Sequence, residues 1–124
     1  MAARSSEAGT ELVERMFGAG KSLDDYVSFF AEDALYRFGN YPPIRGRPAI
    51  RQAAANFRQR VRGVSHAVEG MWESGDTVVS EMEITYTRLD GRQVTVPCCD
   101  VFRVNGDKIQ EMRIFVDVTP VISG

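Results

Sequence analysis

Three turn signals at nearly regular spacing divide the second half of the chain, and this pattern restricts the fold more than any other feature. The signals are Ser74-Gly75-Asp76, Asp90-Gly91 and Asn105-Gly106. They separate runs of about ten residues rich in β-branched and aromatic side chains, as is typical of hairpin turns between antiparallel strands. From Val64 onward, the sequence therefore predicts a four-strand antiparallel meander.

The first half of the chain shows the apolar spacing of amphipathic helices instead. It predicts a helix over residues 7–19, a short helix that begins at Ser22, and a third helix over residues 48–63. The predicted buried stripe of the short helix is Leu23, Tyr26, Val27 and Phe30. Between the last two helices, residues 35–38 predict a strand and residues 39–43 a rigid loop that contains two adjacent prolines. Long strands twist strongly, so three N-terminal helices can close the concave side of a curved sheet. The predicted fold class is α+β.

Length and composition are those of one ordinary globular domain over residues 1–124. A chain of 124 residues buries enough surface to fold without disulfides, and its 44% hydrophobic and 26% charged residues are near the usual averages. The N-terminal residues lack the apolar stretch of a signal peptide, and no window approaches the roughly 20 apolar residues of a membrane-spanning helix. A cytoplasmic location without a membrane partner is therefore expected.

The charge pattern argues against a polyanionic partner. The formal net charge is −2, and no run of basic residues supplies a local attraction for nucleic acid. Four arginines of the third predicted helix are interpreted as a solvated face: Arg51, Arg58, Arg60 and Arg62. No nucleic-acid partner is expected.

Several well-known chemistries lack their residues in this sequence. His66 is the only histidine, so metal sites and catalytic mechanisms that need two imidazoles are excluded. Cys98 and Cys99 are adjacent in a predicted strand and point to opposite faces, which favours packing over a disulfide or a metal cluster. No glycine-rich phosphate loop, nucleophile elbow or dinucleotide fingerprint occurs, so no cofactor and no metal is expected.

The candidate acids follow from strand parity, because alternate residues of a strand share a face. Asp100 shares its face with Cys98 and Phe102, so its carboxyl group has little hydration if that face is concave. Asp117 shares a face with Phe115 in the last strand. A carboxyl group in an apolar pocket keeps its proton near neutral pH while a second carboxylate nearby stays ionised, so such a pair supplies both an acid and a base.

Other polar and aromatic side chains have two interpretations each. Glu83 either enters a pocket or faces water, opposite an apolar set on the same strand. His66 lies near the start of the first long strand and is either a hydrogen-bonded strand-end residue or part of a pocket lip. Trp72, Tyr86 and Phe115 either pack in the core or form a platform for a substrate.

The order of helix, helix, strand, helix and long meander resembles the nuclear-transport-factor-2-like superfamily, and particularly its SnoaL-like polyketide cyclase branch. The segments that carry the resemblance are residues 29–34, 46–50, 100–109 and 115–117. The resemblance implies a cone-shaped, cystatin-like fold with three N-terminal helices on a strongly curved antiparallel sheet. It does not imply one reaction, because the fold serves isomerases, dehydratases, cyclases, epoxide hydrolases and non-catalytic binding proteins.

The resemblance also implies a homodimer that buries the outer face of the sheet. The apolar residues assigned to that outer face are Ile84, Tyr86, Ile114 and Val116. The expected protein partner is therefore a second copy of the chain.

Two enzyme branches can be compared with the sequence residue by residue. The ketosteroid isomerase branch has an oxyanion-stabilising acid just before a Phe-Arg pair, and Asp100 matches that position. The general-base aspartate of this branch falls on Phe38, and its helix-one tyrosine falls near Met16. The resemblance thus implies the acid of this branch without its base.

The limonene epoxide hydrolase branch has a tyrosine before a Pro-Pro-x-x-Gly-Arg loop, which resembles Tyr36 and residues 42–47. Its last strand ends with an arginine followed four residues later by an aspartate, here Asp117. The resemblance implies that Asp117 is the base that activates water, that Tyr36 together with Asn40 holds this water, and that Glu83 protonates the epoxide oxygen. The arginine between the two acids of that branch falls near Glu81, so its Asp-Arg-Asp arrangement is not reproduced.

Together these features predict an enzyme without a cofactor that acts on an apolar oxygenated small molecule, such as a terpenoid or polyketide-like compound. The predicted catalytic residues are Asp117, Asp100, Glu83 and Tyr36. The residues predicted to contact the substrate are Asn40, Phe38, Phe57, Phe102, Phe115, Arg113, His66 and Trp72. The predicted reactions, in order of preference, are epoxide opening by water or an internal hydroxyl, cyclisation or isomerisation, and dehydration. The alternatives are a non-catalytic module that binds an apolar ligand and a dimeric structural module with a filled pocket.

Overall fold

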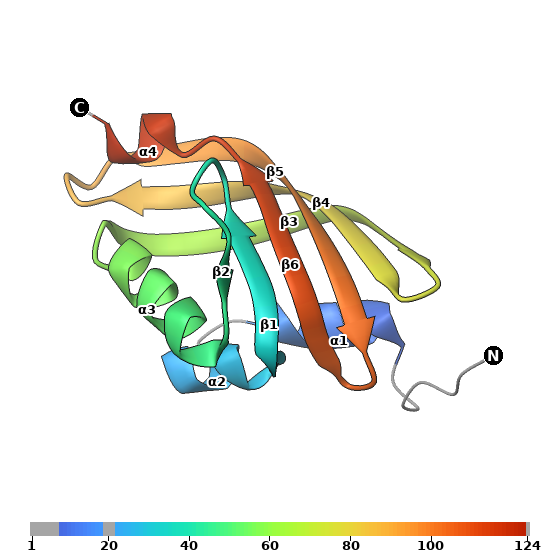
Figure 1. The fold of residues 1–124 in the computed structure, drawn as a ribbon. Coiled ribbons are helices and arrows are strands. Elements are labelled where there is room, and N and C mark those ends of the chain that lie inside the picture. Colours follow the sequence, from blue (N-terminus) through green and yellow to red (C-terminus); the bar gives the residue numbers. More distant parts are fainter. Residues whose placement is uncertain (1–7, 19–21, 124) are drawn as a thin grey trace.

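The computed structural model describes residues 8–18 and 22–123, and within these ranges it contains four helices and six strands (Figure 1). In chain order the elements are α1 (Gly9–Met16), α2 (Leu23–Ser28), β1 (Phe30–Phe38), β2 (Ile44–Arg45), α3 (Arg47–Arg58), β3 (Val61–Ser74), β4 (Thr77–Arg88), β5 (Gln93–Asn105), β6 (Lys108–Val116) and α4 (Thr119–Ile122). In the same two ranges, no helix has the length and apolar character needed to cross a membrane.

The strands form one six-stranded sheet in the order β2-β1-β6-β5-β4-β3. Strands β3 to β6 pair antiparallel with their neighbours in sequence, which confirms the predicted meander. Its three turns contain Gly75, Gly91 and Gly106, all with positive φ, a conformation that glycine adopts without steric cost. The strand β1 joins the other side of β6 in parallel, and the sequence did not predict the short edge strand β2 beside it.

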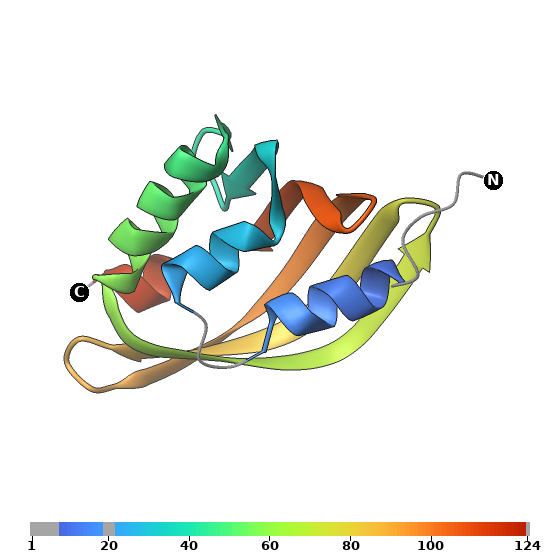
Figure 2. The same ribbon diagram turned by 90° about the horizontal axis from the view of Figure 1, so that it is seen from below.

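The sheet is curved, and α1, α2 and α3 lie on its concave side, as predicted (Figure 2). Burial alternates along β4: Ser80 and Met82 are buried, whereas Glu81 between them is exposed. The first helix adds Leu12 and Met16 to the same core. Full burial of one such side chain stabilises the fold by about 1.5–3 kcal/mol, so the concave core holds helices and sheet together.

Helix starts agree with the sequence where the local signal is specific. Ser22 caps α2, and its Oγ accepts a hydrogen bond from the backbone N–H of Asp25 at 3.0 Å. Pro48 lies in the first turn of α3, where its missing N–H costs nothing. The first helix was predicted over residues 7–19, and the two ends of that range lie outside the described residues.

Two element boundaries differ from the prediction. The strand β1 begins at Phe30, which the helical spacing assigned to the second helix, rather than at residue 35. Val61 was assigned to the third helix and is instead a buried residue of β3. Both residues are apolar and lie at a junction, where helical and strand spacing agree equally well with the sequence.

The C-terminal helix α4 was not predicted, because four residues show no periodicity. Arg88 of β4 holds it: Nη1 of this buried side chain donates hydrogen bonds to the carbonyl oxygens of Pro120 and Ser123, both at 2.8 Å. At the start of the helix, Asp117 Oδ1 accepts a hydrogen bond from the backbone N–H of Thr119 at 3.0 Å. Contacts from distant residues therefore fix this helix in place.

Candidate functional site

The pairing of the strands places Asp100 in the middle of the concave face. Asp100 of β5 lies opposite Ser80 of β4 and opposite Ile114 of β6. Ile114 in turn lies opposite Phe38 of β1. Residues paired in this way project from the same face of a sheet. Asp100 therefore lies between an apolar side chain and a small hydroxyl, both of them buried.

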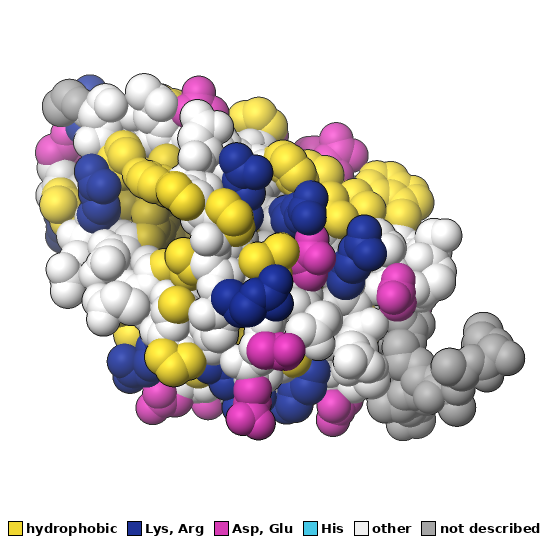
Figure 3. Space-filling model, viewed as in Figure 1, with side chains coloured by type: hydrophobic (Ala, Val, Ile, Leu, Met, Phe, Trp, Pro, Cys, Tyr) yellow, Lys and Arg dark blue, Asp and Glu magenta, His cyan; other side chains and the backbone are white. Residues whose placement is uncertain are grey.

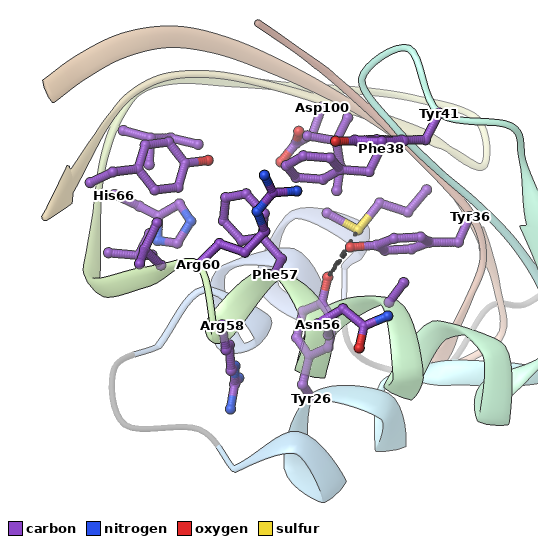
Figure 4. A pocket seen from close by; sticks show the side chains of 18 of the residues that line it. Tyr26, Tyr36, Phe38, Tyr41, Asn56, Phe57, Arg58, Arg60, His66 and Asp100 are labelled. Atoms are coloured by element: carbon purple, nitrogen blue, oxygen red, sulfur yellow. Dashed lines mark hydrogen bonds between the residues drawn. The ribbon is translucent and has the colours of Figure 1, made fainter. Parts of the chain in front are cut away.

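A pocket of about 850 Å³ lies between the concave face and the helices (Figure 4). Several aromatic rings form part of its walls, and Phe57 of α3 packs against Phe38 with ring centroids 5.0 Å apart and against Tyr86 at 5.6 Å. A volume of this size is within the roughly 300–1,000 Å³ typical of small-molecule sites. The rings line a cavity and do not fill it. The alternative of a dimeric structural module with a filled pocket requires the opposite.

Asp100 has an unusual electrostatic environment. It is 2% exposed, and none of the ion pairs among the described residues includes it. Burial raises the pKa of the Asp100 carboxyl to about 7, and the hydrogen bond that Cys98 Sγ donates to Oδ1 at 3.3 Å opposes this rise. Near neutral pH, a large fraction of Asp100 therefore carries its proton.

Two tyrosines from different elements meet near Asp100. The hydroxyl groups of Tyr26 in α2 and Tyr36 in β1 are 3.3 Å apart, and Tyr26 also donates to Met112 Sδ at 3.7 Å (Figure 4). Burial raises the pKa of Tyr36 to about 12 and raises that of Tyr26 as well. Both phenols are therefore neutral at physiological pH and can donate hydrogen bonds to an oxygen atom of a ligand.

The other end of the pocket is more polar and open to solvent. His66 lies there against Phe17, with ring centroids 5.2 Å apart, and partial burial lowers the pKa of its imidazole. Three arginines contribute to the same mouth: Arg58, Arg60 and Arg62. Figure 4 shows His66 on the side of the pocket away from Tyr36. In the described part of the chain, no three His, Cys, Asp or Glu side chains come together as metal ligands.

Five of the residues predicted for the site line this pocket. They are Tyr36, Phe38, Phe57, His66 and Asp100. Among the described residues that line the pocket, Asp100 is the only carboxylic acid. The structure thus brings together the acid and aromatic residues of the prediction. Their roles toward a substrate remain predictions.

The other predicted acids do not reach the pocket. Asp117 is exposed at the start of α4, and its hydrogen bonds with Thr119 lower the pKa of its carboxyl. Glu83 pairs with Ala67 and Pro97 on the convex face. Of the two interpretations that the sequence allowed for Glu83, the structure thus supports the one in which it points away from the pocket. Asp117 matches the motif of the limonene epoxide hydrolase branch, but it does not lie in the pocket, where a base that activates water is required.

The remaining predicted contacts are also elsewhere. Phe102 is fully buried in the core, and Asn40 is exposed in the turn after β1. Trp72 and Phe115 are each 57% exposed on the convex face, where Arg113 forms an ion pair with Glu111. None of these side chains lines the pocket.

The assignment of apolar residues to the outer face was wrong. Ile84, Tyr86 and Ile114 are buried on the concave side and line the pocket, and Val116, which pairs with Cys98, faces the same way. Strand parity separates residues into two sets, but it does not say which set faces the helices. The packing of the helices on one face of the sheet decides this (Figure 2).

Sequence reasoning missed some pocket residues. Tyr26 was placed only in the buried stripe of the second helix, and Met112 was not considered. The sequence did contain a signal for Tyr86. This residue shares a strand face with Met82, and assigning Met82 to the core would have placed Tyr86 on the covered face as well. No local signal connects Tyr26 with Tyr36, since only the packing of α2 on β1 brings them together.

The sequence matches the SnoaL-like domain over residues 10–112. This chain belongs to the SnoaL-like family. No curated protein sequence matches it.

Solved structures agree with this family in their fold. A nuclear-transport-factor-2-like protein of unknown function from Burkholderia pseudomallei has a TM-score of 0.86 at 15% identity, covering 93% of this chain and 97% of that one. A protein from Jannaschia, for which polyketide cyclase activity of the SnoaL-like type has been suggested, has a TM-score of 0.81 at 22% identity over 100% and 99%. An LEH-like epoxide hydrolase from M. tuberculosis has a TM-score of 0.66 at 21% identity over 80% and 73%. At these identities the similarity establishes the fold.

Proposed function

We propose that this chain binds an apolar, oxygenated small molecule in the pocket and that protonated Asp100 acts as a general acid on an oxygen atom of that molecule. The observation that carries the proposal is a carboxyl group that lines the pocket, is 2% exposed and has a pKa of about 7. A general acid works best when its pKa is close to the working pH. The suggested cyclase and the epoxide hydrolase among the structural neighbours are consistent with this class of reaction.

The reaction that best suits a single acid is the opening of an epoxide, with or without ring closure. The Asp100 carboxyl would transfer its proton to the epoxide oxygen while the C–O bond breaks. A water molecule or an internal hydroxyl would attack the carbon, and its proton would return to the Asp100 carboxylate. The neutral hydroxyl groups of Tyr26 and Tyr36 would stabilise the charge that develops on the oxygen.

Proton abstraction from carbon has less support. In the comparison with the isomerase branch, Phe38 occupies the general-base position, and its ring packs against Phe57. Asp117 and Glu83, the other acids of the prediction, lie outside the pocket. An acid without a neighbouring base favours ring opening or cyclisation over isomerisation.

The test uses a panel of cyclic terpenoid and polyketide-like epoxides in ¹⁸O-labelled water, with products followed by mass spectrometry. A labelled diol would report attack by water, and an unlabelled cyclic ether would report attack by an internal hydroxyl. Asp100→Asn should lower kcat by roughly 10²- to 10⁴-fold, because the acid is removed and the shape is kept. Asp107→Asn, an exposed carboxylate in the turn after β5, is the matched control. Equal turnover by Asp100→Asn and Asp107→Asn would refute the proposal.

A second candidate is a binding module without catalysis. What favours it is that the pocket holds one carboxyl group, while His66, whose imidazole pKa is lowered by burial, lies toward the opposite end (Figure 4). In that case, compounds from the panel should raise the Tm of the protein without forming a product. They should do so equally well with Asp100→Asn.

We further propose that two copies of the chain pair through the convex face. Its exposed Trp72 and Phe115 lie among Val79 and Val101, which are partly buried, and charged side chains of both signs border this region (Figure 3). A two-fold axis would place this same patch of each copy against the other and bury its apolar side chains. Sedimentation velocity should show a dimer that Trp72→Ser converts to a monomer. A monomeric wild type at micromolar concentration would rule the dimer out.

A further inference from the structure

Three arginines border the pocket mouth in a chain whose formal net charge is −2. Arg58 ends α3, Arg60 lies in the turn that follows, and Arg62 is the second residue of β3. Figure 4 shows the side chain of Arg60 turned over the pocket and that of Arg58 directed away from it. Three guanidinium groups within five residues of sequence make this mouth a local centre of positive charge.

These arginines differ from most others in what they contact. Arg51, Arg88, Arg92, Arg103 and Arg113 each form an ion pair with a carboxylate. No carboxylate among residues 8–18 and 22–123 forms an ion pair with Arg58, Arg60 or Arg62. All three side chains are exposed, as expected for a solvated face, and their positive charge is therefore available to a ligand.

We propose that the ligand of this pocket is an organic acid, with an apolar body between the aromatic walls and an anionic group held by Arg60, while the nearby charges of Arg58 and Arg62 add to the attraction (Figure 4). This inference rests on the proposed function, because it identifies the substrate class of the same pocket. Guanidinium groups bind carboxylate and sulfonate groups through charge and paired N–H donors. The anionic group would thereby fix the end of the ligand that stays at the mouth.

The strand pairing indicates the length of such a ligand. His66 at the mouth lies opposite Ile84 of β4, and Asp100 lies opposite Ser80 of the same strand. The four steps along the strand from Ser80 to Ile84 span roughly 13 Å at about 3.3 Å per residue. A body of two or three rings would therefore place its reacting oxygen near Asp100 while its anionic group remains among the arginines.

Two fluorescent probes with the same three rings test the proposal. One is 1-anilinonaphthalene-8-sulfonate, and the other is N-phenyl-1-naphthylamine, which lacks the sulfonate. The wild type should bind the sulfonate roughly ten-fold more tightly than the neutral probe at low salt, and 0.5 M salt should reduce this preference. Combined substitution of Arg58→Gln, Arg60→Gln and Arg62→Gln should remove the preference and leave the Kd of the neutral probe unchanged.

Three controls make each outcome decisive. Arg51→Gln changes an arginine of the same helix whose partner is Asp24, and it should keep the preference. Ala54→Phe, which fills part of the pocket, should weaken both probes, whereas Trp72→Ser on the convex face should weaken neither. If the triple variant keeps the preference, or if the wild type has none, the organic-acid inference is overturned and the proposed function stands. If neither probe binds in the pocket, the proposed function fails and the inference fails with it.

Discussion

The concave and convex faces of β4 and β5 place the same kinds of side chain in opposite environments. Asp100 and Phe102 on the concave face are 2% and 0% exposed, whereas Phe115 of the adjacent strand is 57% exposed on the convex face. Burial raises the pKa of Asp100 to about 7, and the acids of the convex face, such as Glu81, lie against solvent. The comparison teaches that the face of the sheet, rather than the residue type, decides whether a carboxyl group can serve as an acid near neutral pH.

The largest expected effect comes from the two phenylalanines. Phe102→Ala should lower the free energy of unfolding by about 3–5 kcal/mol, because it removes a fully buried ring and leaves a cavity. Phe115→Ala should change it by no more than about 0.5 kcal/mol in the monomer. Urea denaturation at low protein concentration measures both. If the two variants lose similar amounts of unfolding free energy, the two faces do not differ in burial as described.

The next effect is the pH dependence of stability that Asp100 contributes. The pKa of the Asp100 carboxyl is raised from 3.8 to about 7 by burial, so the folded state binds this proton more tightly than the unfolded chain does. Its stabilising contribution is complete below pH 3.8 and is lost as the pH rises through about 7. Between pH 5 and pH 8, the wild type should therefore lose about 2–3 kcal/mol relative to Asp100→Asn. Parallel stability profiles of the two proteins would contradict this account.

A smaller effect is expected at Ser80, the neighbour of Asp100 across the strands. Its hydroxyl group is buried and has no hydrogen-bond partner among the described residues. Ser80→Ala should therefore leave stability unchanged or raise it by about 1 kcal/mol, because a buried hydroxyl without a partner costs free energy. Thermal unfolding of the two proteins at pH 6 measures the difference. A loss of more than about 1 kcal/mol would show that the hydroxyl binds a neighbour such as Asp100.

The smallest effect is expected at Asp117, and its sign is opposite to that of Asp100. Hydrogen bonds with Thr119 lower the pKa of the Asp117 carboxyl, so its contribution to stability is present at neutral pH and is lost as the pH falls. Asp117→Asn should lower the Tm slightly at pH 7, with a smaller difference at pH 3. Turnover should remain that of the wild type, since the side chain lies outside the pocket. A large loss of turnover would return Asp117 to the mechanism.

The sequence predicted much of the fold because its strongest signals are local. The turns at Gly75, Gly91 and Gly106 set the meander, and Ser22 set the start of α2. Strand parity correctly grouped Asp100 with its buried neighbours. These features depend on residues close in the chain, where backbone geometry leaves few alternatives.

The rest depended on contacts between distant elements. The side of the sheet that the helices cover decides the environment of Tyr86, and the approach of α2 to β1 decides that of Tyr26. The helix α4, which no local pattern predicted, is held by hydrogen bonds from Arg88 of β4. Local patterns contain no information on such choices, since they are fixed by packing in three dimensions.

The most direct test of the central claim is the titration of Asp100 itself. Protein labelled with ¹³C at the aspartate carboxyl carbons can be titrated by NMR, and the Asp100 signal is assigned as the one missing from Asp100→Asn. The structure predicts that this carboxyl titrates with a pKa of about 7. A pKa near 4, the ordinary value for aspartate, would show that Asp100 is ionised in the folded protein and would contradict its role as a general acid.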